Sequence, residues 1–201
     1  MVLNKKLQKY LDIPVLFNSV RHILDQRQDK HVKQILNPFH FKSVLDIACG
    51  TGDFCNVTDA NYVGIDNTPS FIKYCNDKFG SINKKFYLMD ATKLQFKKKQ
   101  FDASLLLSFI HHLPDKLVVD VLRSVAKVTK NKIIIVDLIP SKSNLFSKFF
   151  YAIDRGNHMR SLDKQLELIR KTSVLTIDKV SSFTTKPGIY YHSVIICSIK
   201  K

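Results

Sequence analysis

The chain has 201 residues, 45% of them hydrophobic and 24% charged, which is typical of one globular domain with at most a small extension. No apolar run approaches the ~18 residues of a membrane-spanning helix, and the basic N-terminal segment lacks the apolar core and cleavage site of a signal peptide. The four cysteines match no metal-binding or disulfide pattern, so we expect reduced thiols in the cytoplasm and no metal.

The formal net charge is +15. An excess of this size can indicate an anionic partner such as nucleic acid. The excess is almost all lysine, scattered along the chain among Ile, Asn, Phe and Tyr. This favours compositional drift over a built phosphate-binding surface, which would use bidentate arginine. Both interpretations stay open at this point.

The first 40 residues have a helical pattern. Apolar residues recur at helical spacing, and Asn37-Pro38 predicts the end of the second helix. We therefore divide the chain into an N-terminal helical extension, residues 1–40, and a core, residues 41–201.

From residue 42 onward, short apolar runs alternate with helical patterns. The predicted strands cover residues 43–48, 62–66, 85–90, 101–109, 132–138, 173–180 and 189–199. The predicted helices cover residues 69–79, 115–130 and 161–171, and residues 141–160 have an irregular pattern. Strands that are apolar throughout and alternate with helices indicate a parallel sheet covered on both faces. The Pro187-Gly188 turn predicts that the last two strands form an antiparallel hairpin at the sheet edge.

A glycine-rich turn follows the first predicted strand, in the segment Val44–Gly52. Its two glycines let the backbone turn tightly and approach a ligand closely. A dinucleotide fingerprint would need a third small residue at position 55, which is cysteine. The pattern therefore argues against a nicotinamide cofactor.

Acidic residues end the next two strands. Ligands of open α/β sheets bind at the carboxyl ends of the strands. Asp66 ends the second predicted strand, where a carboxylate can accept hydrogen bonds from both hydroxyls of a ribose. Asp90 ends the third, beside Ala91, where a carboxylate and neighbouring backbone amides can bind adenine.

Two histidines, His111 and His112, follow the fourth predicted strand at the same edge of the sheet. An imidazole titrates near neutral pH, so either could act as a general base. Loop hydrogen bonding and helix capping are their alternative roles.

These motifs occur in order and at fitting spacing: Val44–Gly52, Gly64–Asp66, Met89–Ala91, and Phe101-Asp102 with the His-His-Leu segment. Together they resemble the class I S-adenosylmethionine-dependent methyltransferases, and more narrowly the small bacterial "methyltransferase domain" enzymes that include ubiquinone-biosynthesis relatives. The resemblance is close over residues 42–140. It implies an α/β fold, a Rossmann-like three-layer sandwich whose seven-stranded, mostly parallel sheet has the order 3-2-1-4-5-7-6 with strand 7 antiparallel.

The resemblance also implies that S-adenosyl-L-methionine is the cofactor, and it implies a set of residues that contact it. The methionine end would lie against Asp46, Ala48, Cys49, Gly50 and Gly52, the ribose against Asp66 and Asn67, and the adenine against Asp90 and Ala91, with Ser108 on the cleft floor. Residues 1–40 and 141–160 would cover the site. In the second cover, Arg155 and Arg160 could clamp a carboxylate or phosphate of the acceptor, or form a salt-bridged structural turn.

The sequence departs from the family pattern at two places. The first crossover, between Gly52 and the second strand, is too short for a full helix. The usual Pro-Gly-Gly turn before strand five is replaced by residues 129–132.

Methyl transfer from an activated sulfonium mainly requires that the nucleophile be positioned and water be excluded. A phenol, enol or hydroxyl acceptor also benefits from a base, for which His111 and His112 are the candidates. Because the covering segments are short and the cleft should be enclosed, we expect a small-molecule acceptor. RNA methylation on the same fold is the main alternative because of the basic charge, although no motif suited to a flipped base follows strand four. A non-catalytic cofactor-binding protein is a further alternative.

Overall fold

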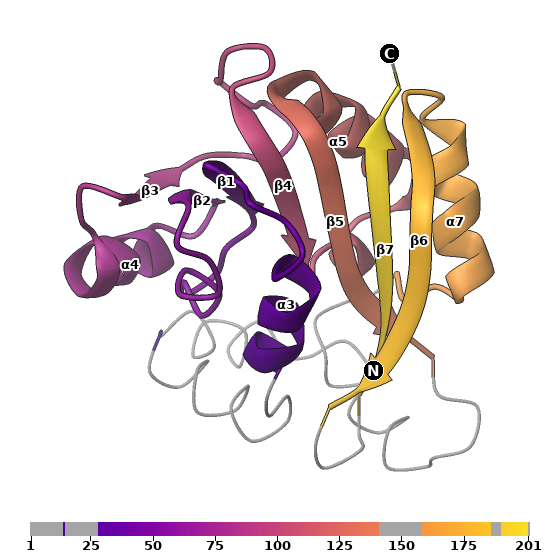
Figure 1. The fold of residues 1–201 in the computed structure, drawn as a ribbon, viewed down its shortest axis with the longest axis horizontal. Helices are drawn as coiled ribbons and strands as arrows, with labels where there is room; N and C mark the ends of the chain where they lie inside the picture. The colour runs from indigo at the N-terminus through magenta and orange to yellow at the C-terminus, as the bar shows by residue number, and fades with distance from the viewer. Residues whose placement is uncertain (1–13, 15–27, 141–157, 186–189, 201) are drawn as a thin grey trace.

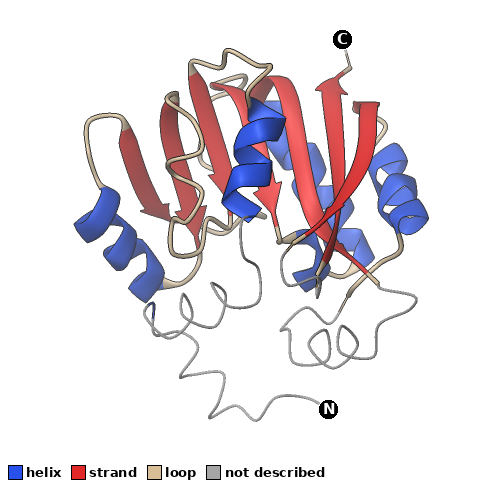
Figure 2. Cartoon of the chain, turned by 60° about the horizontal axis from the view of Figure 1, so that its bottom comes forward, coloured by secondary structure: helices blue, strands red, loops and turns tan. Residues whose placement is uncertain are grey.

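The computed structural model describes residues 14, 28–140, 158–185 and 190–200. These residues form a seven-stranded sheet in the order β3-β2-β1-β4-β5-β7-β6, with helices on both faces (Figures 1 and 2). All neighbouring strands are parallel except for β7, which is antiparallel to both β5 and β6. The three-layer α/β fold and the strand order expected from the resemblance are confirmed.

The strands are β1 (Ser43–Ile47), β2 (Asn61–Asp66), β3 (Lys84–Leu88), β4 (Phe101–Leu107), β5 (Thr129–Ile139), β6 (Leu175–Thr184) and β7 (Tyr191–Ile199). The described helices are α3 (Gln28–Leu36), α4 (Pro69–Phe79), α5 (Asp115–Val128) and α7 (Leu162–Lys171), with a short 3-10 helix, η1 (Ile110–His112). Within the described ranges, no helix is both long and apolar enough to cross a membrane.

The two faces of the sheet have separate hydrophobic cores. Helices α3 and α4 pack on one face, where Val32 is fully buried, and α5 and α7 pack on the other, where Val121 and Ile169 are fully buried. Successive residues of the central strands point to opposite faces, so Ile134 joins the first core and Ile135 the second. Burial on both sides explains why these strands are apolar throughout.

The first crossover has no α-helix, as its length predicts. Residues 48–60 form turns between β1 and β2 instead. Phe54, Cys55 and Val57 in this segment are buried in the core that α3 and α4 share. The segment therefore contributes apolar side chains to this core without forming a helix.

The predicted helix end near residue 130 and strand start at residue 132 are each a few residues late, because α5 ends at Val128 and β5 begins directly at Thr129. The Thr129 hydroxyl donates to the Val125 carbonyl over 2.7 Å and lies 2.6 Å from the Ser104 hydroxyl of β4. The same residue therefore ends the helix and enters the sheet, opposite Phe101 of β4. No turn is needed between the two elements.

The late antiparallel hairpin is confirmed, but β6 continues to Thr184 beyond the predicted end at Val180. Ser181 and Ser182 are exposed and pair with β7. An edge strand with most side chains in solvent has no apolar pattern to mark its end. The Pro187-Gly188 turn, the first helix of the N-terminal extension and residues 141–157 of the predicted cover lie outside the described residues.

Candidate functional site

Strained backbone marks the carboxyl ends of β1 and β4, which are neighbours in the sheet. Ala48 after β1 has a φ of 58° and Ser108 after β4 a φ of 51°. Left-handed conformations cost a non-glycine residue about 1–2 kcal/mol and concentrate at functional sites. Gly50 and Gly52 have φ values of 55° and 77°, which only glycine adopts freely. The predicted cleft therefore contains four residues with left-handed backbone, two of which are not glycine.

Asp66, at the end of β2, holds the glycine-rich turn in place. Its carboxylate accepts hydrogen bonds from the backbone N–H of Gly50 and of Thr68, each over 2.9 Å. The residue is only 8% exposed. Each carboxylate oxygen has a second lone pair, so Asp66 can brace the turn and still accept hydrogen bonds from a ligand's hydroxyls.

Tightly packed thiols lie beneath the turn. The Cys75 thiol donates to the Gly50 carbonyl over 3.4 Å. A Cβ at Gly52 would lie 3.1 Å from the Cys75 sulfur, and one at Gly64 would lie 2.8 Å from the Cys49 sulfur. A hydrogen bond with Cys75 and burial raise the pKa of the Cys49 thiol well above its usual value. Cys49 is thus a protonated packing residue whose side chain lies under the turn.

Asp46 on β1 is buried and accepts a hydrogen bond from the phenol of Tyr62 on β2. Asp46 pairs with Gly64, so Tyr62 is its diagonal neighbour. Burial raises the pKa of Tyr62 well above its usual value, which keeps the phenol protonated and able to donate. Sequence reasoning missed Tyr62. The usable sequence signal was that Tyr62 lies two residues before Gly64, which pairs with Asp46 on the neighbouring strand.

The predicted adenine contacts lie farther along the same edge, after β3. Asp90 is exposed, and its Oδ1 accepts hydrogen bonds from the Thr92 N–H and hydroxyl, both over 2.8 Å. These bonds lower the pKa of Asp90, so the carboxylate stays ionised. Ala91 is half-buried and Asn67 is exposed.

Helix α3 contributes a side chain to this edge. The Ser108 hydroxyl accepts a hydrogen bond from the Gln28 amide over 2.9 Å. Gln28 is buried, and its amide nitrogen also lies 3.5 Å from His192 Nδ1 on β7. The first residue of α3 therefore joins the ends of β4 and β7, two regions that are far apart in the sequence.

The two candidate bases have different environments. His111 is 3% exposed, its Nδ1 contacts the Asp137 carboxylate, and its backbone N–H donates to the other carboxylate oxygen over 2.9 Å. Asp137, on β5, is fully buried. His112 is exposed. Sequence reasoning missed Asp137, although a lone aspartate in a buried apolar strand was a usable signal.

Arg160 does not have the arrangement of a substrate clamp. It is 6% exposed, and its Nε donates to Asp115 over 2.7 Å. Its other guanidinium nitrogens donate to the backbone carbonyls of Ile110, Leu113 and His158. The structure instead shows the salt-bridged turn that was the alternative, because protein acceptors occupy the guanidinium. Arg155 lies outside the described residues.

Together, these groups suit an adenosyl ligand that carries an amino acid end. Backbone groups of the turn could contact one end, the Asp66 carboxylate can accept from ribose hydroxyls, and the Asp90 carboxylate can accept from an exocyclic amine. In the described part of the chain, no cluster of His, Cys, Asp and Glu could hold a metal ion.

Comparison with known proteins agrees with this geometry. Residues 44–132 match the family model described as "Methyltransferase domain". No curated protein matches the chain.

Several solved structures share the fold at low sequence identity. Magnesium protoporphyrin IX methyltransferase from Synechocystis, with bound SAH, is 15% identical with a TM-score of 0.72, over 98% of this chain and 100% of that one. A methyltransferase of Haloferax volcanii, in complex with the Trm112 activator, is 13% identical with a TM-score of 0.79, over 96% and 97%. A SAM-dependent methyltransferase of Methanosarcina mazei is 18% identical with a TM-score of 0.67, over 82% and 96%. Residues 44–132 thus resemble a methyltransferase domain, and the strand order is shared with S-adenosylmethionine-dependent methyltransferases of the same fold.

Proposed function

We propose that the enzyme methylates a small molecule at an ionisable oxygen or nitrogen, and that His111 is the general base. The contact between His111 and the buried Asp137 carries this proposal. A carboxylate on Nδ1 fixes the tautomer and orientation of an imidazole and increases its basicity. His111 follows β4 three residues after Ser108, at the strained edge of the cleft.

In the proposed mechanism, S-adenosylmethionine supplies an activated methyl group. The glycine-rich turn, with Asp46 beneath it, would hold the methionine end, Asp66 the ribose and Asp90 the adenine. His111 Nε2 would accept the acceptor's proton as the new bond to the methyl carbon forms and the carbon–sulfur bond breaks. Asp137 would keep Nδ1 protonated and stabilise the resulting imidazolium.

Buried hydrogen bonds support a fixed position for this base. Arg160 holds the carbonyls of Ile110 and Leu113, on either side of His111 and His112. The His158 N–H donates to the His111 carbonyl over 3.0 Å. A base held in one geometry needs little reorganisation in the transition state.

Replacement of His111 tests this proposal. We expect His111→Asn to lower kcat by about 10²–10⁴-fold and to remove the acidic limb of the pH–rate profile. Asp137→Asn should lower kcat and shift that limb, because the imidazole loses its charged partner. The exposed His40→Asn is the matched control. Unchanged turnover of His111→Asn between about pH 6 and pH 9 would remove His111 from the mechanism.

RNA is the alternative acceptor, and the net charge of +15 supports it. RNA binding would show a steep salt dependence, because lysines would release counterions from phosphates. Titration of bulk RNA at increasing salt therefore separates the two acceptor classes. Absence of RNA binding near physiological salt would leave the small-molecule proposal alone.

We also propose that the enzyme acts in a reducing compartment, as the cytoplasm is. The four cysteines are all free and buried. Burial raises the pKa of Cys55 to about 11 and of Cys197 to about 12, so neither forms a reactive thiolate near neutral pH.

A further inference from the structure

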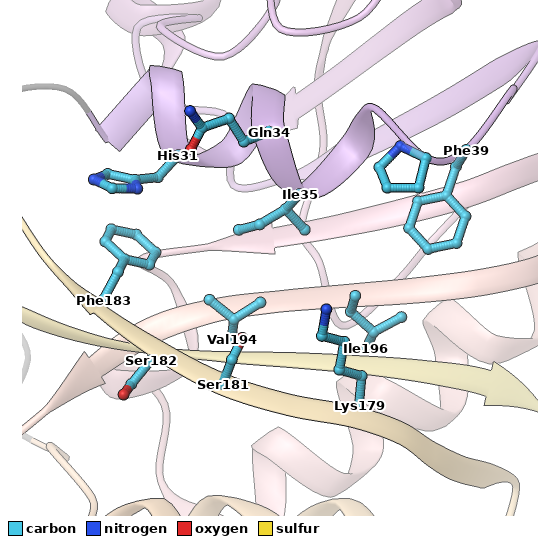
Figure 3. Close-up of a pocket in the computed structure, with 11 residues that line it drawn as sticks. His31, Gln34, Ile35, Phe39, Lys179, Ser181, Ser182, Phe183, Val194 and Ile196 are labelled. Atoms are coloured by element: carbon cyan, nitrogen blue, oxygen red, sulfur yellow. The ribbon is translucent and has the colours of Figure 1, made fainter.

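A groove of about 360 Å³ lies between α3 and the β6–β7 hairpin, on the face of the sheet opposite α7 (Figure 3). It is lined by His31, Gln34, Ile35, Pro38, Phe39, Lys179, Ser181, Ser182, Phe183, Val194 and Ile196. Its volume falls within the usual range of small-molecule sites. None of the residues assigned above to the cofactor or to proton transfer lines it.

The arrangement of helices explains why the groove is open. On this face, α3 covers the middle of the sheet, and no described helix covers β6, whereas α7 lies beside β6 on the other face (Figures 1 and 2). Most β6 side chains are exposed. The groove therefore lies between the middle of the sheet, which α3 covers, and the β6 edge, which no described helix covers on this face.

The lining combines an apolar floor with cationic and polar groups. Ile35, Val194 and Ile196 form the apolar part, and the Phe183 ring stacks on His31 with 4.3 Å between centroids. The ammonium group of Lys179 points toward α3, across from Ile35 (Figure 3).

No carboxylate balances Lys179 within the groove, because none of the described lining residues is acidic. The adjacent Asp178 is held elsewhere, by the Lys132 ammonium over 2.8 Å and the Ser198 hydroxyl over 2.6 Å. We propose that this groove binds a small molecule with a flat aromatic or branched apolar body and one anionic group. The body would lie on Ile35, Val194 and Phe183, and the anion would face Lys179.

The groove is linked to the methyl-transfer edge by a chain of ring and amide contacts. Phe183 stacks on His31 on one side and on His192 on the other, the latter at 4.9 Å between centroids. His192 contacts Gln28, which donates to Ser108 on the cleft floor. A ligand against His31 and Phe183 would therefore lie at the far end of this chain of contacts, in a site of its own.

The test uses two fluorescent probes with the full-length protein: anilinonaphthalene sulfonate, which is aromatic and anionic, and its uncharged counterpart phenylnaphthylamine. We expect the sulfonate to bind at a single site and more tightly than the uncharged probe. Lys179→Glu should weaken sulfonate binding by about tenfold and leave the uncharged probe unaffected. Ile35→Trp, which fills the groove, should abolish binding of both probes.

Matched controls exclude general effects of charge and size. Lys33→Glu changes an exposed charge of α3 outside the groove, and Leu117→Trp adds the same ring on the opposite face. Both should bind the probes like the wild type. If Lys33→Glu weakened sulfonate binding as much as Lys179→Glu does, the proposal of an anion site at Lys179 would be overturned. Undiminished binding to Ile35→Trp would overturn the groove as the site.

Titration with S-adenosylhomocysteine in the presence of saturating sulfonate probe separates this site from the cofactor cleft. We expect the affinity for S-adenosylhomocysteine to be retained, because no cofactor residue lines the groove. Mutual displacement of the two ligands would overturn a separate site. Since this readout requires no methyl acceptor, it stands whether or not the role proposed for His111 survives.

Discussion

The edge of the sheet at which the predicted site lies has two halves, which are built from different kinds of contact. Around β1 and β2, polar groups bond with partners that are close in sequence. Gly50 bonds with Asp66 and Asp46 bonds with Tyr62, and each pair is 16 residues apart. Under β4, β5 and β7, the partners are distant: Gln28 reaches Ser108 across 80 residues and lies beside His192 across 164. We call these the local half and the assembled half.

We propose that this difference separates cofactor binding from acceptor binding. The local half mainly holds backbone, through glycines and a carboxylate, and suits a ligand common to the whole family. The assembled half joins side chains from α3, η1, β5 and β7. Its side chains can change without altering the cofactor's contacts, so acceptor choice would be determined there.

The largest stability effect should come from the assembled half. Arg160→Ala removes the ion pair with Asp115 and frees three carbonyls, so the free energy of unfolding should fall by about 2–4 kcal/mol. Urea unfolding measures this loss. Turnover should fall as well, because the loop around His111 loosens, while the affinity for S-adenosylhomocysteine stays the same. Loss of cofactor affinity at unchanged stability would break the division into two halves.

Gly64→Ala, in the local half, should instead lower the affinity for the cofactor. Its Cβ would lie 2.8 Å from both the Cys49 sulfur and the Phe86 ring. Overpacking of this kind costs about 1–3 kcal/mol, and displacement of Cys49 would move the turn that we expect to bind the cofactor. Calorimetry should show weaker cofactor binding, while Ile82→Ala, at an 88% exposed residue, should match the wild type. Unaltered cofactor affinity in Gly64→Ala would show that the turn does not depend on its packing.

The smallest effect should be the pH dependence that arises from Asp115. A hydrogen bond from Arg160 lowers the pKa of Asp115 in the folded protein. A depressed folded pKa stabilises the fold above the unfolded pKa, near 3.9, and this stabilisation is lost as pH falls through the folded value. Asp115→Asn should therefore lose less stability than the wild type when pH is lowered below about 4. If the stabilities of Asp115→Asn and the wild type fell equally as pH was lowered, the Arg160–Asp115 ion pair would contribute nothing to the pH dependence.

Much of the fold could be predicted because local patterns encode it. The central strands are buried on both faces and apolar throughout, and the resemblance to the methyltransferase family implied the order of strands. The start of β5 and the end of β6 could not be predicted. Thr129 ends a helix and enters the sheet through contacts with Val125 and Ser104, and β6 is defined by its pairing with β7.

The same contrast applies to the site. The sequence predicted the strained glycine-rich turn and the Asp66 carboxylate at the end of β2, since each depends on residues a short distance along the chain. It predicted two equivalent histidines, whereas the structure distinguishes His111 through Asp137. Arg160 resembled a substrate ligand because its partners, Asp115 and three carbonyls, become neighbours only in the folded chain.

We propose that the local half binds S-adenosylmethionine through Asp66. Calorimetric titration of the wild type, Asp66→Ala and the exposed control Asp59→Ala with S-adenosylhomocysteine tests it most directly. We expect binding to the wild type and the control, and affinity about a hundredfold lower in Asp66→Ala, which would lose the two proposed hydrogen bonds from the ribose hydroxyls. Equal affinity in all three proteins would contradict it.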